Sequence, residues 1–257
     1  MIKHSVGKRM SRKIIIYSSV ALAIILISFM GIRYAYNLGY IRLNYPSPDL
    51  YPVHGIDVSH HQLKIDWDKL DKNKVQFAFI KATEGGDFKD TQFKKNWAQA
   101  KQLNIPRAAY HFFTFCRDGK EQAYNFIESV PKDSTNLPPI IDLEFAGNCS
   151  PQNYRENIIH EIALYIETIE DYYGKKVLIY TTEEFYLKYL IKHFESNPIW
   201  IRDIQTTPQL DNNRKWLFWQ YADKGRLEGI ETLVDLNVFH GTKEEFDKLL
   251  RSSSIAD

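Results

Sequence analysis

Carboxylate side chains stand at or just after the end of several apolar, strand-like runs of this chain, and no other feature constrains its fold as strongly. An ionised carboxylate is costly to bury without partners, so apolar strands do not end in acids by default. The acids stand in four short segments: Asp57 in GIDVS (55–59), Glu84 in KATEG (81–85), Asp142 and Glu144 in IDLE (141–144), and Asp235 in VDLN (234–237). In a barrel of parallel strands, the carboxyl ends of the strands hold the active site. The pattern therefore predicts a hydrolase built on a barrel.

Short apolar runs alternate with helical patterns along most of the chain. Runs rich in β-branched and aromatic residues predict strands at 54–58, 76–81, 108–113, 139–143, 176–180, 199–201, 216–220 and 234–238. Most are apolar throughout, which is typical of strands covered on both faces. Three- and four-residue periodicity predicts helices over 91–103, 153–173, 183–193 and 243–250, with Gly174 as a stop for the second.

This order indicates an α/β barrel whose last third is irregular, because the connections between the last strands are short. A doubly wound open sheet is the alternative. We find no glycine-rich phosphate loop after the first predicted strand, which weakens the nucleotide-binding version of that alternative.

The N-terminal region predicts a membrane anchor. Residues 14–32 form a 19-residue stretch without a charge, which as a helix spans roughly 28 Å, close to the hydrocarbon thickness of a bilayer. Basic residues precede it, so residues 1–13 are expected in the cytoplasm and the rest of the chain on the extracytoplasmic side. A cleaved signal peptide is the alternative, but its apolar core is usually about 7–15 residues and ends in a small-x-small site. We favour a single-pass anchor in the cell membrane.

Residues 33–52 predict an extended linker, because they contain Pro46, Pro48 and Pro52 and show no apolar period. The remaining residues, 53–257, are enough for one catalytic domain with a large core. The formal net charge is +1, and no basic tract lies outside the anchor flank. We therefore expect no nucleic-acid partner. We also expect a monomeric enzyme.

Cys116 and Cys149 are the two cysteines of the chain. Two cysteines make no disulfide framework by count alone, and they are equally compatible with two unrelated buried thiols. Each follows a predicted strand by a few residues, and those strands are consecutive, so their loops are expected to be neighbours. Because an extracytoplasmic domain permits oxidation, we favour a disulfide between them.

Asp142 and Glu144 are expected to act together. Two residues apart in a strand, their side chains point to one face, about 6.6 Å apart along the backbone. Repulsion between two such carboxylates raises one pKa, which gives a group protonated near neutrality beside a group that stays anionic. Glycoside cleavage needs that combination of a proton donor and a negative group.

Asp57 and Asp235 are predicted to end the first and last strands, which are neighbours in a closed barrel. A lone aspartate is more often an N-cap, a loop salt bridge or a solvated turn residue. Such separate structural roles do not account for acids at the same end of three strands. The combination therefore predicts one acidic site.

At these residues the chain resembles the family-25 glycoside hydrolases, which are lysozymes acting as N-acetylmuramidases. The matching strings are GIDVSHHQ followed by IDW, then FAFIKATEG, AAYHFF, PPIIDLE, IYT, WQYADKG and VDLNVF, in the family's order and over roughly residues 53–241. The resemblance implies a TIM-like barrel of the (β/α)5(β)3 type. It also implies hydrolysis of the β-1,4 bond between N-acetylmuramic acid and N-acetylglucosamine in peptidoglycan.

The resemblance also implies roles for individual residues. Glu144 matches the proton donor and Asp142 the acid that supports it, while Asp57 and Asp235 match the remaining acids of the site. Further candidates for lining the groove and binding substrate are Lys81, Glu84, Tyr110, Tyr180, Trp200 and Trp219. The chain departs from the family at Leu63, where glycine is frequent, and at Arg202-Asp203, where Trp-Ile is usually followed by alanine. We expect neither departure to touch the acids.

Other residues are weighed against packing roles. The aromatic candidates for stacking on sugar rings are Tyr110, Phe112, Phe113, Tyr180, Trp200, Trp219 and Tyr221. We expect about half of them to be packed in the core, and we expect Tyr110 and Trp219 to contact sugar. A buried lysine needs a carboxylate partner, so Lys81 is predicted to pair with an acid of the site. No metal or other cofactor is expected, because the chain lacks HxH and HExxH motifs, and His60, His61 and His111 are interpreted as polar groups of the rim.

Two alternatives to a muramidase stay open. One is a cell-wall-binding module with an inactive site. The other is a barrel hydrolase that cleaves a chitin-like β-1,4 glycan. The sequence also leaves open whether cleavage retains or inverts the anomeric centre, because 6.6 Å lies between the carboxyl separations of about 5–5.5 Å and 6.5–9.5 Å associated with the two outcomes.

Overall fold

The computed structural model describes residues 3–132, 137–154 and 156–252, and it divides into two compact units, Met1–Arg42 and Leu43–Asp257. The first unit contains helix α1 (Lys3–Asn37), in which the segment Arg12–Asn37 is long and apolar enough to cross a membrane. A signal sequence near an N-terminus has the same properties. The helix continues to Asn37, so residues 33–37 are helical where an extended linker was expected.

The second unit begins ten residues before the predicted domain boundary. Tyr51 explains this difference, because its ring packs 6.1 Å from the ring of Trp216 and 5.8 Å from that of Trp219. The end of the predicted linker is therefore part of the folded domain.

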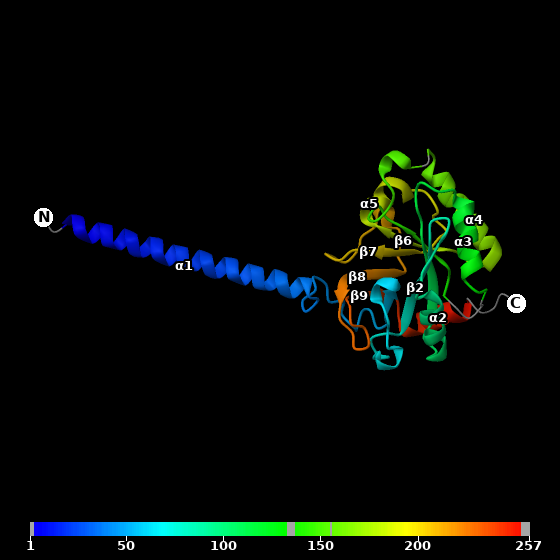
Figure 1. Ribbon diagram of the computed structural model, residues 1–257, viewed down its shortest axis with the longest axis horizontal. Helices are drawn as coiled ribbons and strands as arrows, with labels where there is room; N and C mark the ends of the chain where they lie inside the picture. The colour runs from blue at the N-terminus through cyan, green and yellow to red at the C-terminus, as the bar shows by residue number, and fades with distance from the viewer. Residues whose placement is uncertain (1–2, 133–136, 155, 253–257) are drawn as a thin grey trace. The chain divides into compact units, whose positions relative to one another are not determined.

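A closed barrel of eight strands forms the second unit (Figure 1). Its strands are β1 (His54–Val58), β2 (Phe77–Glu84), β4 (Arg107–Phe112), β5 (Ile140–Leu143), β6 (Leu178–Thr182), β7 (Ile199–Arg202), β8 (Phe218–Gly225) and β9 (Val234–Phe239). Seven strands run parallel, and β9 is antiparallel to both of its neighbours, β8 and β1. The short strand β3 (Phe88–Lys89) adds a hairpin to β2. The predicted barrel is confirmed, and the open sheet is excluded because β1 also pairs with β2.

Helices lie around the strands, except for the last one, whose Phe246 packs against the Phe77 and Phe239 rings of the barrel interior. They are α2 (Phe93–Gln102), α3 (Gly119–Ser129), α4 (Ile158–Tyr173), α5 (Glu183–Phe185) followed by the π-helical turn η4 (Tyr186–Leu190), and α6 (Lys243–Ser252). Short 3₁₀ turns complete the connections: η1 (His60–Gln62), η2 (Trp67–Lys69), η3 (Pro151–Asn153) and η5 (Asp211–Asn213). Helix α3 was not predicted. The described residues between β8 and β9 contain no helix, which confirms the irregular last third.

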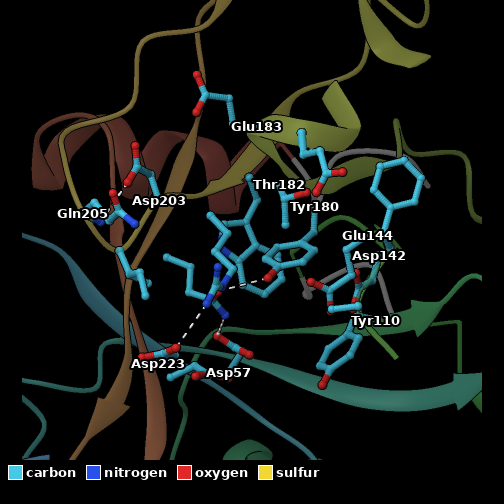
Figure 2. A pocket seen from close by; sticks show the side chains of 18 of the residues that line it. Asp57, Tyr110, Asp142, Glu144, Tyr180, Thr182, Glu183, Asp203, Gln205 and Asp223 are labelled. Atoms are coloured by element: carbon cyan, nitrogen blue, oxygen red, sulfur yellow. Dashed lines mark hydrogen bonds and ion pairs between the residues drawn. The ribbon is translucent and has the colours of Figure 1, made fainter. Parts of the chain in front are cut away.

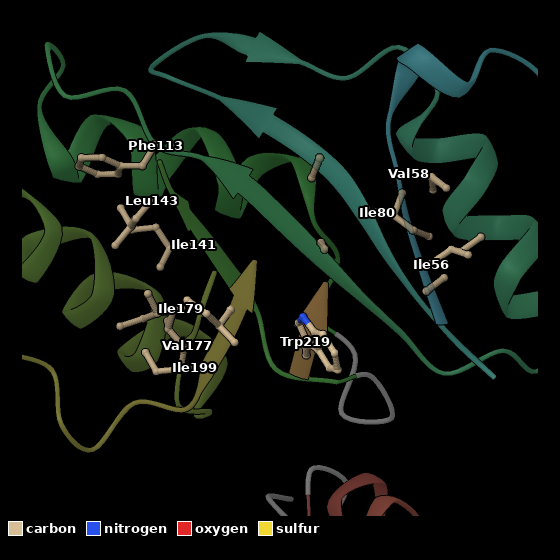
Figure 3. Packing of buried hydrophobic residues seen from close by; sticks show 14 of the residues in the cluster. Ile56, Val58, Ile80, Phe113, Ile141, Leu143, Val177, Ile179, Ile199 and Trp219 are labelled. Carbon is tan, nitrogen blue, oxygen red and sulfur yellow. The ribbon is translucent and has the colours of Figure 1, made fainter. Parts of the chain in front are cut away.

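Side chains alternate between two apolar layers. One layer lies between strands and helices and includes Ile56, Ile80, Ile141, Ile179 and Trp219 (Figure 3). The other fills the barrel with large rings, among them Phe77, Phe79, Trp200 and Phe218. Gly55 faces this second layer, and a Cβ atom there would come within 2.5 Å of the Phe77 ring. The glycine of the first motif is therefore required by close packing.

Above the rings, the next inward-facing position of each strand is polar. Strand periodicity of two places Lys81 above Phe79, Arg202 above Trp200, and Gln220 above Phe218. Asp57 of β1 and Asp142 of β5 also line the mouth of the barrel. The barrel interior is therefore sealed by aromatic rings, and its carboxyl rim carries the polar side chains.

Candidate active site

One groove crosses the carboxyl rim of the barrel. It consists of two adjoining cavities of about 680 and 460 Å³ that share several lining residues. The shared residues are Asp57, Tyr110, Asp142, Glu144, Ala146 and Asp235. The four acids predicted from the sequence thus lie together, at the middle of the groove. Figure 2 shows three of them, Asp57, Asp142 and Glu144.

Asp142 and Glu144 form one side of this centre, next to Tyr110 in Figure 2. Asp142 lies within β5, opposite Phe112 of β4 and Tyr180 of β6, and its side chain is buried. Glu144 follows the last residue of the strand and is half-buried. The Oδ1 atom of Asp142 has no hydrogen-bond partner among the described residues.

Burial controls the protonation of this pair. It raises the pKa of Glu144 from 4.5 to about 7, against the opposing charges of Arg202 and Lys81. Burial also raises the pKa of Asp142 well above its usual value, and the charge of Glu144 is the next cause. The predicted repulsion is present, but loss of solvation is the larger effect.

Asp57 and Asp235 form the other side of the centre. They lie directly opposite each other on β1 and β9. Asp57 Oδ2 accepts hydrogen bonds from Gln220 Nε2 at 2.9 Å and Asn237 Nδ2 at 2.8 Å, and Asp57 also hydrogen-bonds Asp235. Burial raises the pKa of both acids, and that of Asp235 further, because Asp57 adds its charge while the amides favour ionised Asp57. Asp57 and Asp235 are therefore a hydrogen-bonded acid pair in which the two amides favour the ionised form of Asp57.

Asp235 reaches the rim differently from the prediction. It is the second residue of β9, not its end. Because β9 runs antiparallel to β1, the start of β9 lies beside the end of β1. The expectation that Asp235 ends its strand was wrong, although its place at the rim agrees.

Lys81 has the carboxylate partner that its burial requires. Its Nζ lies 2.7 Å from Glu84 Oε2, and its ammonium also lies 5.1 Å from the centroid of the Phe112 ring. Lys81, Glu84 and Phe112 all line the smaller cavity. The predicted ion pair is therefore present at the edge of the groove.

Three of the predicted aromatic residues line the groove at its centre and its larger cavity. Tyr110 is half-buried, and Trp200 and Tyr180 are buried below it. Tyr180 donates its hydroxyl to Gln220 Oε1 at 3.0 Å, and Trp200 donates Nε1 to Asn237 Oδ1 at 2.8 Å. The last two rings thus form a floor tied to the amides that hold Asp57.

Trp219 does not line the groove, and its predicted substrate-binding role is corrected. It lies in the layer between strands and helices, and its Nε1 donates to the Asp203 carbonyl at 2.7 Å. The inward-facing residue of this motif is Gln220, its neighbour. Phe113 and Tyr221 are buried in the same outer layer as Trp219.

The three histidines differ in position. His111 is fully buried between Thr83 and Gln122, not at the rim as expected, and burial lowers its pKa to about 3. His61 lines the smaller cavity, and His60 lies 2.7 Å from the Asp90 carboxylate.

Arg202 enters the groove, contrary to the expectation that this departure leaves the acids untouched. Its guanidinium lies 3.1 Å from Asp223 Oδ2, and both residues line the larger cavity. The charge of Arg202 also acts on the pKa values of Glu144, Asp57 and Asp235. Sequence reasoning missed Asp223, Gln220 and Asn237 as well. A polar residue inside an apolar run was the available signal for the last two.

Cys116 and Cys149 are free thiols in the structure, where a disulfide was predicted. Their loops are neighbours as expected, because the two thiols interact. Burial, followed by this interaction with Cys116, raises the pKa of Cys149 to about 11.

Comparison with known proteins supplies independent evidence. Residues 56–230 match the family described as "Glycosyl hydrolases family 25". The uncharacterized protein YegX of Escherichia coli K12 is 35% identical over 203 residues, covering 77% of this chain and 73% of YegX. Lysozyme M1 of Streptomyces globisporus is 31% identical over 205 residues, covering 74% of this chain and 68% of that enzyme.

Solved structures agree with the fold. A family 25 glycosyl hydrolase from Bacillus anthracis is similar with a TM-score of 0.75 and 42% identity, covering 81% of this chain and 97% of the other. A bacterial lysozyme from Streptomyces coelicolor is similar with a TM-score of 0.67 and 28% identity, covering 80% and 98%.

Proposed function

Because the chain belongs to glycosyl hydrolase family 25, it is a glycoside hydrolase of the lysozyme type acting on peptidoglycan, and we propose that Glu144 is its general acid. The bond cleaved is the β-1,4 linkage between N-acetylmuramic acid and N-acetylglucosamine. One observation carries the assignment of Glu144: a carboxyl group in the middle of the groove has its pKa raised to about 7.

Glu144 donates its proton to the glycosidic oxygen as the bond from that oxygen to the anomeric carbon breaks. Water supplies the hydroxyl group that the anomeric carbon gains, and its remaining proton restores Glu144. A general acid works best when its pKa lies near the operating pH, which a buried glutamic acid achieves.

Asp142 supports this step from the same strand. The positive charge that develops on the sugar in the transition state is stabilised by a nearby carboxylate. The unpartnered Oδ1 of Asp142 is also available to accept a hydrogen bond from the substrate's N-acetyl group. Asp57, which is fixed by two amides, and its partner Asp235 complete the acidic wall. The remaining substrate-binding surface is formed by Lys81, Glu84, Tyr110, Tyr180 and Trp200.

Replacement of Glu144 by Gln tests the assignment. The full-length protein in detergent is incubated with purified peptidoglycan, and released reducing ends and fragment masses are measured. Since a general acid contributes about 10²–10⁴-fold, E144Q is expected to lose at least that much turnover. Glu231→Gln, at an exposed acid outside the groove, is the matched control.

The alternatives give other outcomes. A wall-binding module releases no reducing ends even as wild type. A hydrolase of chitin-like glycans degrades chitin oligomers faster than peptidoglycan. Wild-type turnover by E144Q contradicts the role of Glu144.

The apolar part of α1 acts, in our proposal, as an uncleaved membrane anchor that leaves the barrel on the extracytoplasmic side as a monomer. The apolar segment Arg12–Asn37 and the basic residues before the uncharged stretch support this topology. Fractionation of cells tests it. We expect to find the full-length protein in the membrane fraction, and we expect protease added to spheroplasts to digest the barrel. A shortened soluble form indicates a cleaved signal peptide.

Cys116 and Cys149 form, in our proposal, a disulfide once an extracellular oxidant accepts their two electrons and two protons. The neighbouring thiols support this reaction. Closing a loop of about 34 residues is expected to stabilise the fold by roughly 3–4 kcal/mol on the chain-entropy model. Mass spectrometry of the protein from its native compartment, with and without reductant, decides between disulfide and free thiols.

A further inference from the structure

Asn148 lies four residues after Glu144 and fastens the loop that follows β5 to the loop that follows β4. Its Nδ2 donates to the Phe113 carbonyl at 2.8 Å and to the Glu144 carbonyl at 3.1 Å. Its Oδ1 accepts from the backbone N–H groups of Phe115 and Cys149, both at 3.0 Å. One side-chain amide therefore joins backbone groups of both loops.

This side chain continues the sheet where β5 stops. The β4–β5 pairing places Phe112 opposite Asp142, and the Phe113 N–H donates to the Asp142 carbonyl at 3.0 Å, but β5 ends at Leu143. In a parallel ladder, a residue donates to one carbonyl of the next strand and accepts from the N–H two residues later. Asn148 makes that pattern with Phe113 and Phe115, so its amide takes the place of the next peptide group of β5.

A tight turn returns Asn148 to this position. The Asn148 N–H donates to the Phe145 carbonyl at 3.2 Å, and Gly147 has a φ of +74°. Glycine reaches this left-handed conformation without the steric cost of a Cβ atom. The segment 144–148 is therefore built to bring an asparagine amide back to the carbonyl of Glu144.

We propose that Asn148 is a positioning residue for Glu144, holding the backbone of the general acid in line with the end of β5. The inference rests on the proposed role of Glu144. Glu144 lies one residue beyond the strand, so ladder pairing of β5 does not fix it, and the bond from Asn148 does. Placement matters because a displacement of about 1 Å at a reacting group can cost up to about 10²-fold in rate.

A looser segment 144–148 is also expected to change the pH dependence of the hydrolysis rate. Burial is the largest cause of the raised pKa of Glu144, so a more hydrated carboxyl has a pKa closer to its ordinary 4.5. The basic limb of the rate profile, which reports protonated Glu144, then moves to lower pH. The other charged or titratable groups that line the groove are unchanged in this test. They are Asp57, His61, Lys81, Glu84, Tyr110, Asp142, Tyr180, Glu183, Glu184, Arg202, Asp203, Asp223 and Asp235.

Replacement of Asn148 by Ala is the direct test, measured on soluble peptidoglycan fragments with the full-length protein in detergent. We expect kcat to fall by about 10–100-fold, KM to stay within about three-fold, and the basic limb of kcat to move to lower pH. Gly147→Ala strains the turn and leaves the amide in place. It is expected to give the same signature at smaller size, and it keeps the test decisive if N148A does not fold.

Asn197→Ala is the matched control. Asn197 also bridges chain segments, since its Nδ2 donates to the Val177 carbonyl at 2.9 Å and to Glu170 Oε1 at 2.7 Å, but it does not line the groove. This variant is expected to lower the melting temperature and leave kcat and its pH profile unchanged. An unchanged kcat and pH profile in both N148A and G147A, or the same pH shift in N197A, overturns the inference. If E144Q is active, the proposed function itself fails; if E144Q is inactive and N148A is like wild type, only the positioning role fails.

Discussion

The two acid pairs at the barrel mouth contain the same functional groups but have opposite surroundings. Asp57 accepts hydrogen bonds from two amides, and its partner Asp235 lies opposite it in sheet register. Asp142 keeps an oxygen without a partner among the described residues, and Glu144 stands just beyond its strand. The first pair is held by the protein, and the second is left open toward the groove.

This difference separates a supporting role from a reactive one. Amide donors favour the ionised form of Asp57 and fix its direction, so that pair gives a stable charge distribution. Burial without amide donors raises the pKa values of Asp142 and Glu144, so this pair holds a proton beside a carboxylate and leaves oxygens free for substrate. The variants below test whether the contrast holds.

Asp142→Asn is expected to have a large effect on turnover, second only to that of Glu144→Gln. It removes the carboxylate that stabilises positive charge on the sugar, and we expect kcat to fall by about 10²-fold, or about 2.7 kcal/mol. Because repulsion no longer favours a proton on the pair, the basic limb of the pH profile moves to lower pH. Initial rates from pH 4 to 9 measure both effects. Wild-type kcat with an unchanged limb contradicts the role of Asp142.

Glu144→Gln is expected to make the protein more stable at high pH. The folded pKa of about 7 exceeds the ordinary value of 4.5, so the stabilisation by Glu144 is full below pH 4.5 and is lost as pH rises through 7. Glutamine does not titrate. The free energy of unfolding of E144Q is therefore expected to exceed that of wild type by about 2 kcal/mol at pH 8, allowing for partial exposure of the group, and by little at pH 4.5. Denaturant unfolding at both pH values measures it, and an equal difference at the two values contradicts the shift.

The sequence predicted the barrel because strands covered on both faces are apolar throughout, which separates them from the amphipathic helices. Helix α3 escaped prediction because its buried face includes polar side chains, those of Gln122 and Asn125, which break the apolar period. Asp118 as N-cap, with Glu121 three residues on, was the signal that could have shown its start.

The acids of the site were predictable for a related reason, since charges in apolar runs are anomalies that packing does not explain. The direction of each strand and the side of the sheet to which each side chain points were not predictable. Periodicity carries no strand direction, so antiparallel β9 was missed. In β8 both faces are buried, so the residues Trp219 and Gln220 gave no indication of which one points inward.

Asn237→Ala tests the held pair. Asn237 donates to Asp57 Oδ2 at 2.8 Å and accepts from Trp200 Nε1, also at 2.8 Å. Its loss leaves buried polar groups with fewer partners and is expected to cost about 1.5 kcal/mol of stability. The lost donor also raises the pKa of Asp57. Thermal unfolding measures the cost, and we expect turnover to fall less than in D142N. A larger loss of turnover than in D142N would reverse the assignment of supporting and reactive pairs.

Arg202→Met gives the smallest expected effect and decides which acid pair depends on the charge of this cation. Arg202 lowers the pKa of Glu144 and acts on Asp57 and Asp235 as well. Removing its charge is expected to raise the pKa of Glu144, so the basic limb of kcat moves to higher pH by up to about one unit, equivalent to at most about 1.4 kcal/mol. Arg202→Lys keeps the charge and should keep the limb. R202M could instead leave the basic limb in place and lower stability. That outcome means that the charge of Arg202 stabilises Asp57, Asp235 and the ion pair with Asp223, and that burial alone raises the pKa values of Asp142 and Glu144.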